Sequence, residues 1–129
     1  MKTQAIIIDL DGTLCNITHR RHFVQGEKKD WKSFYAGAVN DEPNDWCYEI
    51  IRAFQNDYTI IFVSGRPGNY KQMTLDWLSQ WCYVEEIPNC VLLMRTEGDY
   101  RPDYIVKEEI YDNSIAPYFD ILFAIDDRK

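Results

Sequence analysis

The stretch Ala5-Ile-Ile-Ile-Asp-Leu-Asp-Gly-Thr-Leu14 decides the fold, because an apolar run passes directly into two carboxylates. This short β-branched run predicts a strand over residues 4–10 that is buried on both faces, as in parallel sheets. Asp9 and Asp11 follow at its end, where like charges raise each other's proton affinity unless a cation relieves them. A hard cation with oxygen ligands, such as magnesium (Mg2+), is the simplest partner. The alternative is an exposed Asp-x-Asp-Gly turn.

Length and composition limit the class of protein. The chain has 129 residues, 46% of them hydrophobic, which suits one domain, and its net charge of -7 excludes a broad basic surface for duplex nucleic acid. The four cysteines are scattered without Cys-x-x-Cys spacing, which favours free thiols in a reducing compartment. No leader precedes the first strand, and no apolar run is long enough to span a bilayer, so we expect a cytoplasmic protein without a membrane partner.

Residues 14–40 are aromatic and charged and lack periodicity, which predicts a small cap-like insert after the first strand. The part from His19 to Lys32 is locally basic and could lean over the carboxylate turn to attract an anion, or form solvated helical turns. His19 and His22 could share a helix face, but two histidines make an incomplete zinc site. Trp31 lies among lysines, so it is the tryptophan to test for stacking on a substrate.

The remaining chain alternates between helical and strand patterns. Pro43 suits the first position of a helix whose core stripe would be Trp46, Ile50, Ile51 and Phe54. The further elements expected are a strand at 58–63, a helix at about 70–81, a strand near 90–93 after a break at Pro88-Asn89, a loop at 94–102, a helix from Pro102-Asp103, and a strand at 121–125.

Polar side chains follow three of the predicted strands. Asp9 and Asp11 follow the first, Ser64 the second, and Asp126 and Asp127 the last. Strands that alternate with helices form a parallel sheet with right-handed crossovers, and ligands bind beyond the carboxyl ends of such strands. We therefore expect these groups to form an active site.

The chemistry that suits these residues is phosphoryl transfer. Asp9, Asp126 and a backbone carbonyl near Asp11 would hold the metal, and Asp9 would attack phosphorus. Lys107 would neutralise phosphate charge, and the Ser64 hydroxyl with nearby N–H groups would hold other oxygens. Asp11 would protonate the leaving alcohol and then activate water.

Taken in order, Asp9-Leu-Asp-Gly-Thr13, Ser64, Lys107 and Asp126-Asp127 resemble the haloacid dehalogenase superfamily of phosphotransferases. The resemblance implies a three-layer Rossmann-like α/β fold with helices on both faces of a parallel sheet. The four predicted strands, numbered along the chain, would lie in the order 4-1-2-3. It also implies a magnesium-dependent phosphatase that acts through an aspartyl-phosphate.

Four segments sharpen this resemblance: Ser64-Gly65-Arg66, Arg95 to Glu109, Ile115 to Asp120 and Ile125 to Arg128. They are similar to the 3′-phosphatase domains of bacteriophage polynucleotide kinase/phosphatases, which implies a phosphorylated nucleic-acid 3′ end as substrate. The implied catalytic residues are Asp9, Asp11 and Lys107. The implied phosphate-binding residues are Asp9, Thr13, Ser64, Gly65, Arg66, Arg95, Asp103 and Lys107. The implied metal ligands are Asp9, Asp11, Asp126 and Asp127.

Several alternatives remain at this stage. A response-regulator receiver domain also has an acidic pocket, a hydroxyl and a lysine, but its acceptor aspartate lies on a later strand than its acidic pair. A noncatalytic phosphate-binding module, or a phosphatase of free nucleotides or small phosphomonoesters, would use the same pocket. The sequence contains no Gly-rich loop followed by Lys-Ser/Thr, so it does not predict a kinase half. We expect residues 1–129 to be one domain with the last strand at an exposed edge. Either the carboxyl-terminal part of the fold is cut short, or the last metal ligand, Asp126, is loosely held.

Overall fold

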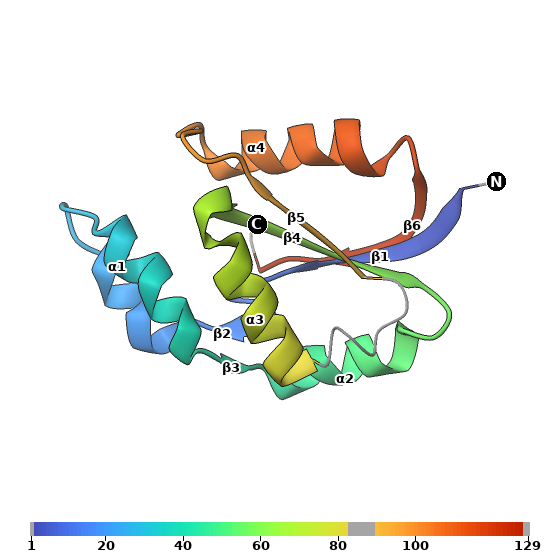
Figure 1. The fold of residues 1–129 in the computed structure, drawn as a ribbon, viewed down its shortest axis with the longest axis horizontal. Coiled ribbons are helices and arrows are strands. Elements are labelled where there is room, and N and C mark those ends of the chain that lie inside the picture. The colour runs from blue at the N-terminus through green and yellow to red at the C-terminus, as the bar shows by residue number, and fades with distance from the viewer. Residues whose placement is uncertain (1, 83–89, 128–129) are drawn as a thin grey trace.

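Four parallel strands form the central sheet of the computed structural model, which describes residues 2–82 and 90–127. The strands β1 (Thr3–Asp9), β4 (Thr59–Pro67), β5 (Cys90–Arg95) and β6 (Phe119–Ile125) lie in the order β5-β4-β1-β6 (Figure 1). Each pairing between neighbours is parallel. The predicted α/β class is therefore confirmed, and the four strands lie in the order that the resemblance implied. The break expected at Pro88-Asn89 falls outside the described residues.

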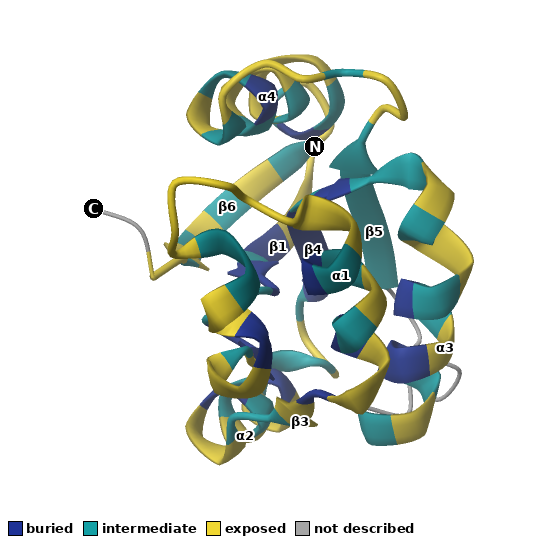
Figure 2. Cartoon of the chain, turned by 90° about the vertical axis from the view of Figure 1, so that its left-hand side faces the viewer, coloured by how far each residue is buried: buried dark blue, intermediate teal, exposed yellow. Residues whose placement is uncertain are grey.

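Helices cover both faces of this sheet, as Figures 1 and 2 show. On one face lie α2 (Asp45–Phe54) and α3 (Lys71–Cys82). On the other lies α4 (Asp103–Ile110), which continues as a π-helical segment (Tyr111–Ile115). No helix in the described ranges has the length and apolar character needed to cross a bilayer. The helices expected at about 70–81 and from Pro102-Asp103 are thus present, each within a residue of its expected start.

The two sides of the sheet have separate cores because side chains alternate along each strand. The core beneath α2 and α3 includes Ile6, Ile8, Phe62, Ile51, Trp77 and Leu78. The core beneath α4 includes Ala5, Ile61, Val63 and Ile115. β1 and β4 contribute to both, so their runs read as continuous apolar sequence, as predicted for buried parallel strands.

A bulge in β6 determines where the last carboxylates point. Ala5 pairs with Ile121 but Ile7 pairs with Ala124, so β6 carries one extra residue between these pairs. After the bulge, Phe123 and Ile125 pack against the core beneath α2 and α3. Asp126 therefore follows on the α4 side of the sheet, where Lys107 reaches it.

Residues 15–44 leave the sheet after β1 and lie beyond the carboxyl ends of its strands (Figure 2). β2 (Cys15–Asn16) and β3 (Glu42–Pro43) pair antiparallel at the base of this segment. Between them come the 3-10 turn η1 (Thr18–Val24), α1 (Trp31–Ala36) and the 3-10 turn η2 (Gly37–Asn40). The segment is thus short helical turns on a two-stranded stem.

The prediction that Pro43 begins a helix is wrong. Pro43 pairs with Cys15 in the stem, and α2 begins at Asp45 with Asn44 as its N-cap residue. The Asn44 N–H donates to Leu14 O at 2.7 Å and its Nδ2 to Thr13 O at 2.8 Å. Pairing with the loop after β1 therefore delays the helix by two residues.

The core stripe predicted for α2 is wrong at Trp46, whose side chain is 52% exposed. Cys47 and Ile51 are buried instead, and Ile50 and Phe54 pack partly against the same core. The buried face of the helix is thus centred on Cys47 and Ile51, one turn apart, and Trp46 lies outside it.

Candidate active site

Asp9 and Lys107 meet at the carboxyl ends of the strands. Asp9 ends β1 and is 5% exposed, and Lys107 lies on α4. Lys107 Nζ donates to Asp9 Oδ1 at 2.7 Å and to Asp126 Oδ2 at 3.1 Å. It also lies 3.6 Å from Asp103 Oδ2, one helical turn earlier. The structure thus brings together carboxylates from both ends of the chain around one ammonium group.

Burial sets the proton affinity of this group. Burial raises the pKa of Asp9 to about 7, against the opposing charge of Lys107, and the nearby charge of Asp126 also raises it. Burial acts to lower the pKa of Lys107, but the charges of Asp9, Asp103 and Asp126 outweigh it, so that pKa is raised. Lys107 is therefore a fixed cation at neutral pH, and a second cation would favour the ionised form of Asp9.

Three carboxylates could supply that second cation's ligands. Oxygen atoms of Asp9, Asp126 and Asp127 all lie within 4.8 Å of one another. Asp126 and Asp127 are exposed, so water can complete the coordination shell. A set of hard oxygen donors with open positions fits Mg2+. Asp11, also predicted as a ligand, directs its side chain into a different cluster.

The loop after β1 fixes the positions of these carboxylates. Thr13 Oγ1 donates to Asp9 Oδ2 at 3.1 Å and accepts a hydrogen bond from the Asp127 N–H at 3.2 Å. Gly12 has a φ of 85°, and a Cβ at this position would collide with the Asp127 carboxylate. Gly12 and Thr13 therefore join the end of β1 to the residues that follow β6.

Asp11 is held by two arginines. Arg66 donates to it from Nε at 3.2 Å and from Nη2 at 2.6 Å, and Arg20 Nη2 donates to the same Oδ1 at 2.6 Å. Burial alone would raise the pKa of Asp11, but the charges and hydrogen bonds of Arg66 and Arg20 lower it below its ordinary value. Asp11 is therefore a carboxylate here, ready to accept a proton rather than to donate one.

Asp41 completes the support for these arginines. Its carboxylate is fully buried and accepts from Arg20 Nε at 2.8 Å and Nη2 at 2.7 Å. It also bonds His19 Nε2 at 2.6 Å, and its backbone oxygen accepts from Trp77 Nε1 at 2.9 Å. Residues from the insert, the stem and α3 thus hold Arg20 in place beneath Asp11.

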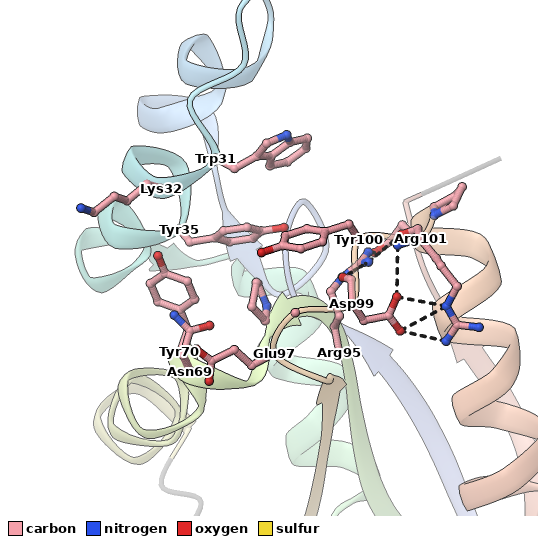
Figure 3. A pocket seen from close by; sticks show the side chains of 14 residues that line it. Trp31, Lys32, Tyr35, Asn69, Tyr70, Arg95, Glu97, Asp99, Tyr100 and Arg101 are labelled. Carbon is pink, nitrogen blue, oxygen red and sulfur yellow. Dashed lines mark hydrogen bonds and ion pairs between the residues drawn. The ribbon is translucent and has the colours of Figure 1, made fainter.

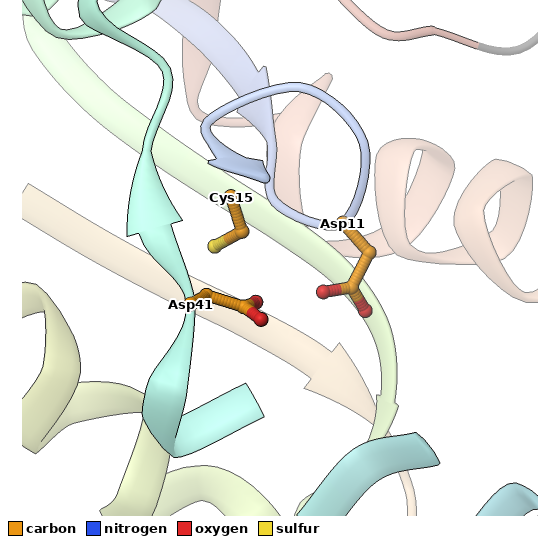
Figure 4. A group of neighbouring side chains, drawn as sticks. All are labelled: Asp11, Cys15 and Asp41. Carbon is orange, nitrogen blue, oxygen red and sulfur yellow. The ribbon is translucent and has the colours of Figure 1, made fainter. Parts of the chain in front are cut away.

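Asp11, Cys15 and Asp41 also present ligand atoms within 4.8 Å of one another (Figure 4). The guanidinium of Arg20 bonds both carboxylates, and Arg66 Nη2 lies 3.6 Å from Cys15 Sγ. Burial raises the pKa of the Cys15 thiol well above its ordinary value, so it stays protonated. Two arginine charges already balance the two carboxylates, so we assign no metal to this group.

The loop after β4 and the start of α4 form the opposite wall. Ser64 is buried, and its Oγ accepts from the Arg66 N–H at 3.1 Å. Arg95 donates from Nε to Gly65 O at 2.8 Å and from Nη2 to Asp103 Oδ1 at 3.4 Å. A Cβ on Gly65 would collide with the Asp103 carboxylate. The arginines predicted to contact phosphate thus direct their donors to protein groups and order this wall.

A cavity of about 330 Å³ lies above these groups. Its floor includes Asp9, Asp11, Ser64, Gly65, Asp103, Lys107 and Asp127. Arg21, Trp31, Phe34 and Tyr35 of the insert line the other side. The cavity therefore combines the predicted site residues with the basic, aromatic segment that follows β1.

Arg20 and Asp41 are site residues that sequence reasoning missed. Arg20 lies within the basic stretch from His19 to Lys32, whose charges suggested a solvent-facing segment or an anion site, yet it is 0% exposed. Its position after the carboxylate turn in an acidic chain was the available signal. The sequence around Asp41 contains no such signal, because an aspartate before Glu-Pro looks like an ordinary helix cap.

The family model for the polynucleotide kinase PNKP phosphatase domain, of the haloacid dehalogenase (HAD) type, matches residues 3–129. The chain belongs to this family. It is therefore a HAD-type phosphatase domain, as the ordered motifs had suggested, and the match spans both clusters of the site.

Two kinds of relative accompany this match. A putative bifunctional polynucleotide kinase/RNA ligase of Autographa californica nuclear polyhedrosis virus is 27% identical over 127 residues, which cover 97% of this chain and 17% of the viral protein. Two structures of the Pnkp1/Rnl/Hen1 complex, one described as an RNA repair complex, match with a TM-score of 0.79 and 30% identity. The two matches cover 99% of this chain and 37% and 40% of the chains in those structures. This chain therefore spans well under half the length of these relatives.

Proposed function

We propose that this domain is a magnesium-dependent phosphomonoester hydrolase that acts through an aspartyl-phosphate and removes the 3′-phosphate from a polynucleotide end. The observation that carries the proposal is the contact between Asp9 and Lys107, 98 residues apart, beside Asp126. A carboxylate is a weak nucleophile towards a phosphate dianion, and fixed positive charge beside it offsets the repulsion. Bound Mg2+, held by Asp9, Asp126 and Asp127, would supply further charge neutralisation and orient the phosphate.

The chain's own residues divide the reaction between them. An Asp9 oxygen attacks phosphorus as the bond to the leaving alcohol breaks, and Lys107 stabilises the phosphoryl oxygens. The contacts of Asp11 with the two arginines first loosen enough for the Asp11 carboxylate to be protonated. Asp11 then donates this proton to the leaving alcohol. As a carboxylate, Asp11 then accepts a proton from the water that attacks the aspartyl-phosphate, which releases inorganic phosphate and restores Asp9.

Ser64 and Thr13 complete the proposed phosphate site. The Ser64 hydroxyl lies in the cavity wall and has a donor available while its oxygen accepts from Arg66. Thr13 donates a hydrogen bond to Asp9 Oδ2, and this bond fixes the orientation of the Asp9 carboxylate for attack on phosphorus. We propose that Arg66, Arg95 and Asp103 orient the phosphate by ordering these groups, because the guanidiniums bond protein atoms.

The polynucleotide 3′ end is supported by the family and by the cavity. The family is named for polynucleotide kinase phosphatase domains, and relatives carry names of polynucleotide kinases and RNA repair. Arg21 and Trp31 in the lining of the cavity suit a phosphate attached to a nucleoside. The free thiols of Cys15, Cys47 and Cys90 support action in a reducing compartment, which we take to be the cytoplasm.

Phosphate release from matched substrates tests this function. A 3′-phosphorylated oligonucleotide, its 5′-phosphorylated isomer and mononucleotides are compared with Mg2+ and with a chelator. We expect the 3′ isomer to be preferred, activity to need Mg2+, and Asp9→Asn to remove it while Asp120→Asn, an exposed carboxylate on β6, retains it. Equal rates on both isomers would leave a general phosphatase, and full activity of Asp9→Asn would end the proposed mechanism. No turnover by the wild type would favour a noncatalytic module.

A further inference from the structure

A second, larger cavity adjoins the catalytic one. It has a volume of about 620 Å³ and shares Trp31, Tyr35 and Asp103 with the catalytic cavity. Four of its aromatic residues, Trp31, Tyr35, Tyr70 and Tyr100, form a surface that we call the aromatic groove, and Lys32 flanks it (Figure 3). Because its inner end is the wall of the catalytic cavity, one extended ligand can occupy both.

The aromatic rings of the groove come from separate elements. Trp31 and Tyr35 on α1 are stacked, with ring centroids 5.8 Å apart and an interplanar angle of 24°. Tyr70 meets Tyr35 from the turn before α3 at 5.4 Å. Tyr100 comes from the loop between β5 and α4, and Figure 3 shows its ring directed toward Tyr35. The groove therefore gathers aromatic rings from α1, from the turn before α3 and from the loop between β5 and α4.

These rings remain in contact with solvent. Tyr100 is 94% exposed and Trp31 is 48% exposed, although each is large enough to stabilise a core. Arg95 bonds the Asp99 and Arg101 carbonyl oxygens, which holds the base of the loop that carries Tyr100. An exposed tyrosine on an anchored loop, opposite an exposed tryptophan, is suited to receive a planar group.

The charges of the groove favour unpaired bases over a duplex. The acidic residues that line the larger cavity, Glu97, Asp99 and Asp103, match its basic ones, Lys32, Arg95 and Arg101, in number. Arg101 bonds Asp99 at 2.8 Å and Glu109 at 2.7 Å, which engages much of its charge. A surface that follows a duplex or a long single strand needs uncompensated cations for many phosphates, whereas stacking of one or two unpaired bases needs ring faces.

We propose that the aromatic groove binds the unpaired bases that lead to the 3′-phosphate, stacked on Trp31, Tyr35 and Tyr100. This inference rests on the proposed function, because the groove gains its orientation from a phosphate held at Asp9 and Lys107. Lys32 also lines the larger cavity, and its side chain is directed away from these rings (Figure 3). By this stacking, the domain selects single-stranded or frayed 3′ ends.

The test compares three single-stranded or small substrates in wild type and variants. They are a 3′-phosphorylated trinucleotide, the same trinucleotide with abasic residues at its two 3′ positions, and glycerol 2-phosphate, which has no ring. For the wild type we expect the abasic change to lower kcat/KM about tenfold or more. For Tyr100→Ala we expect the ratio of kcat/KM for the trinucleotide to that for glycerol 2-phosphate to fall about tenfold, through KM.

Matched variants isolate stacking from other effects. Tyr100→Phe keeps the ring and should retain the wild-type ratio. Tyr118→Ala removes a ring that is 63% exposed and lies outside both cavities, and should also retain it. A blunt duplex with a paired 3′-phosphorylated end should be a poorer substrate than the trinucleotide.

The outcomes separate this inference from the function beneath it. If the wild type hydrolyses glycerol 2-phosphate but shows no preference for the 3′-phosphorylated trinucleotide over its 5′ isomer, both fail. If that preference is present but the abasic substrate and Tyr100→Ala retain wild-type kcat/KM, the groove does not bind bases and only this inference fails. A paired end that reacts as fast as the single strand would also overturn it.

Discussion

Arg66 and Asp11, 55 residues apart in the chain, share three hydrogen bonds between guanidinium and carboxylate, the shortest of 2.6 Å. Arg66 is 1% exposed and also donates to Thr74 Oγ1 at 3.0 Å, so its orientation is fixed from behind. Arg66, which the sequence predicted to bind phosphate, is thus placed to act on Asp11, the proposed general acid and base.

Arg66→Lys keeps the positive charge but loses the planar fork, so Asp11 should be less well oriented and less strongly ionised. We expect kcat to fall about 10- to 100-fold, with a smaller change in KM. The pKa of Asp11 should rise when the fork is lost, so the limb of the pH–rate profile that Asp11 controls should move to higher pH, whether Asp11 acts there as the acid or as the base. Steady-state kinetics across pH measure both effects.

Arg52→Lys is the matched control, because Arg52 pairs only with exposed Glu49 within α2 among the contacts the structure describes. It should leave the pH profile unchanged. A rise in KM alone for Arg66→Lys would instead indicate direct phosphate binding by Arg66.

Lys107→Gln removes the cation that bonds both Asp9 and Asp126. We expect kcat to fall about 10²- to 10³-fold, the usual effect of losing one stabilising donor at a developing charge. Added Mg2+ should not restore the rate, because the ion would be held by Asp9, Asp126 and Asp127 and would not replace the fixed charge that Lys107 places beside Asp9 from α4. Lys71→Gln at the exposed start of α3 serves as the control. Recovery of the rate at high Mg2+ would contradict the separate role of Lys107.

Asp9 should make the stability of the metal-free protein depend on pH. Its pKa is raised by burial to about 7 from an ordinary 3.8, so its contribution to stability is full below about pH 4 and is lost as pH rises through about 7. Mg2+ binds the carboxylate form, so it should raise Tm more at about pH 8 than at about pH 5.5. Thermal unfolding with chelator and with Mg2+ measures this.

Asp9→Asn removes the titrating group. The rise in Tm that Mg2+ causes should therefore differ less between about pH 5.5 and about pH 8 than it does in the wild type. Asp120→Asn should behave as the wild type does. A Tm gain from Mg2+ that is the same at both pH values in the wild type would contradict the assigned site.

Gly12→Ala should weaken Mg2+ binding. A Cβ there would collide with the Asp127 carboxylate, and the φ of 85° adds backbone strain. Displacement of Asp127 should raise the Mg2+ concentration for half-maximal activity about tenfold. Gly26→Ala is the control, since its Cβ would meet nothing closer than 3.9 Å. Equal Mg2+ requirements in both variants would show that Asp127 does not serve the metal.

The strand ends were predictable because they depend on local pattern. Apolar runs that stop at Asp9, Ser64 and Asp126 identify buried strands, and parallel strands must end at the same edge. The residues that the sequence did not reveal depend on contacts made in three dimensions. Arg20 is buried because Asp41 and Asp11 approach from separate segments, and no spacing along the chain encodes that meeting.

The errors in the stem and α2 both concern contacts made in the folded chain. Pro43 is compatible with both a helix start and a strand, and its pairing with Cys15, 28 positions away, decided the outcome. Trp46 is exposed because the face of α2 that packs against the core is centred on Cys47 and Ile51. Propensity is a weak guide where a distant partner competes for the same backbone.

Asp41→Asn should destabilise the fold more than any exposed acidic substitution. The Asp41 carboxylate is fully buried against Arg20, and Asn keeps its shape while removing the charge. Arg20 would then share Asp11 with Arg66 as its remaining carboxylate partner among those the structure describes. We expect the free energy of unfolding to fall by about 3 kcal/mol, measured by urea denaturation, since breaking a buried pair leaves an uncompensated charge. Asp57→Asn, exposed beyond α2, should change it by less than about 0.5 kcal/mol. Equal stability of the two variants would mean that Asp41 does not carry the charge balance of the arginine pair.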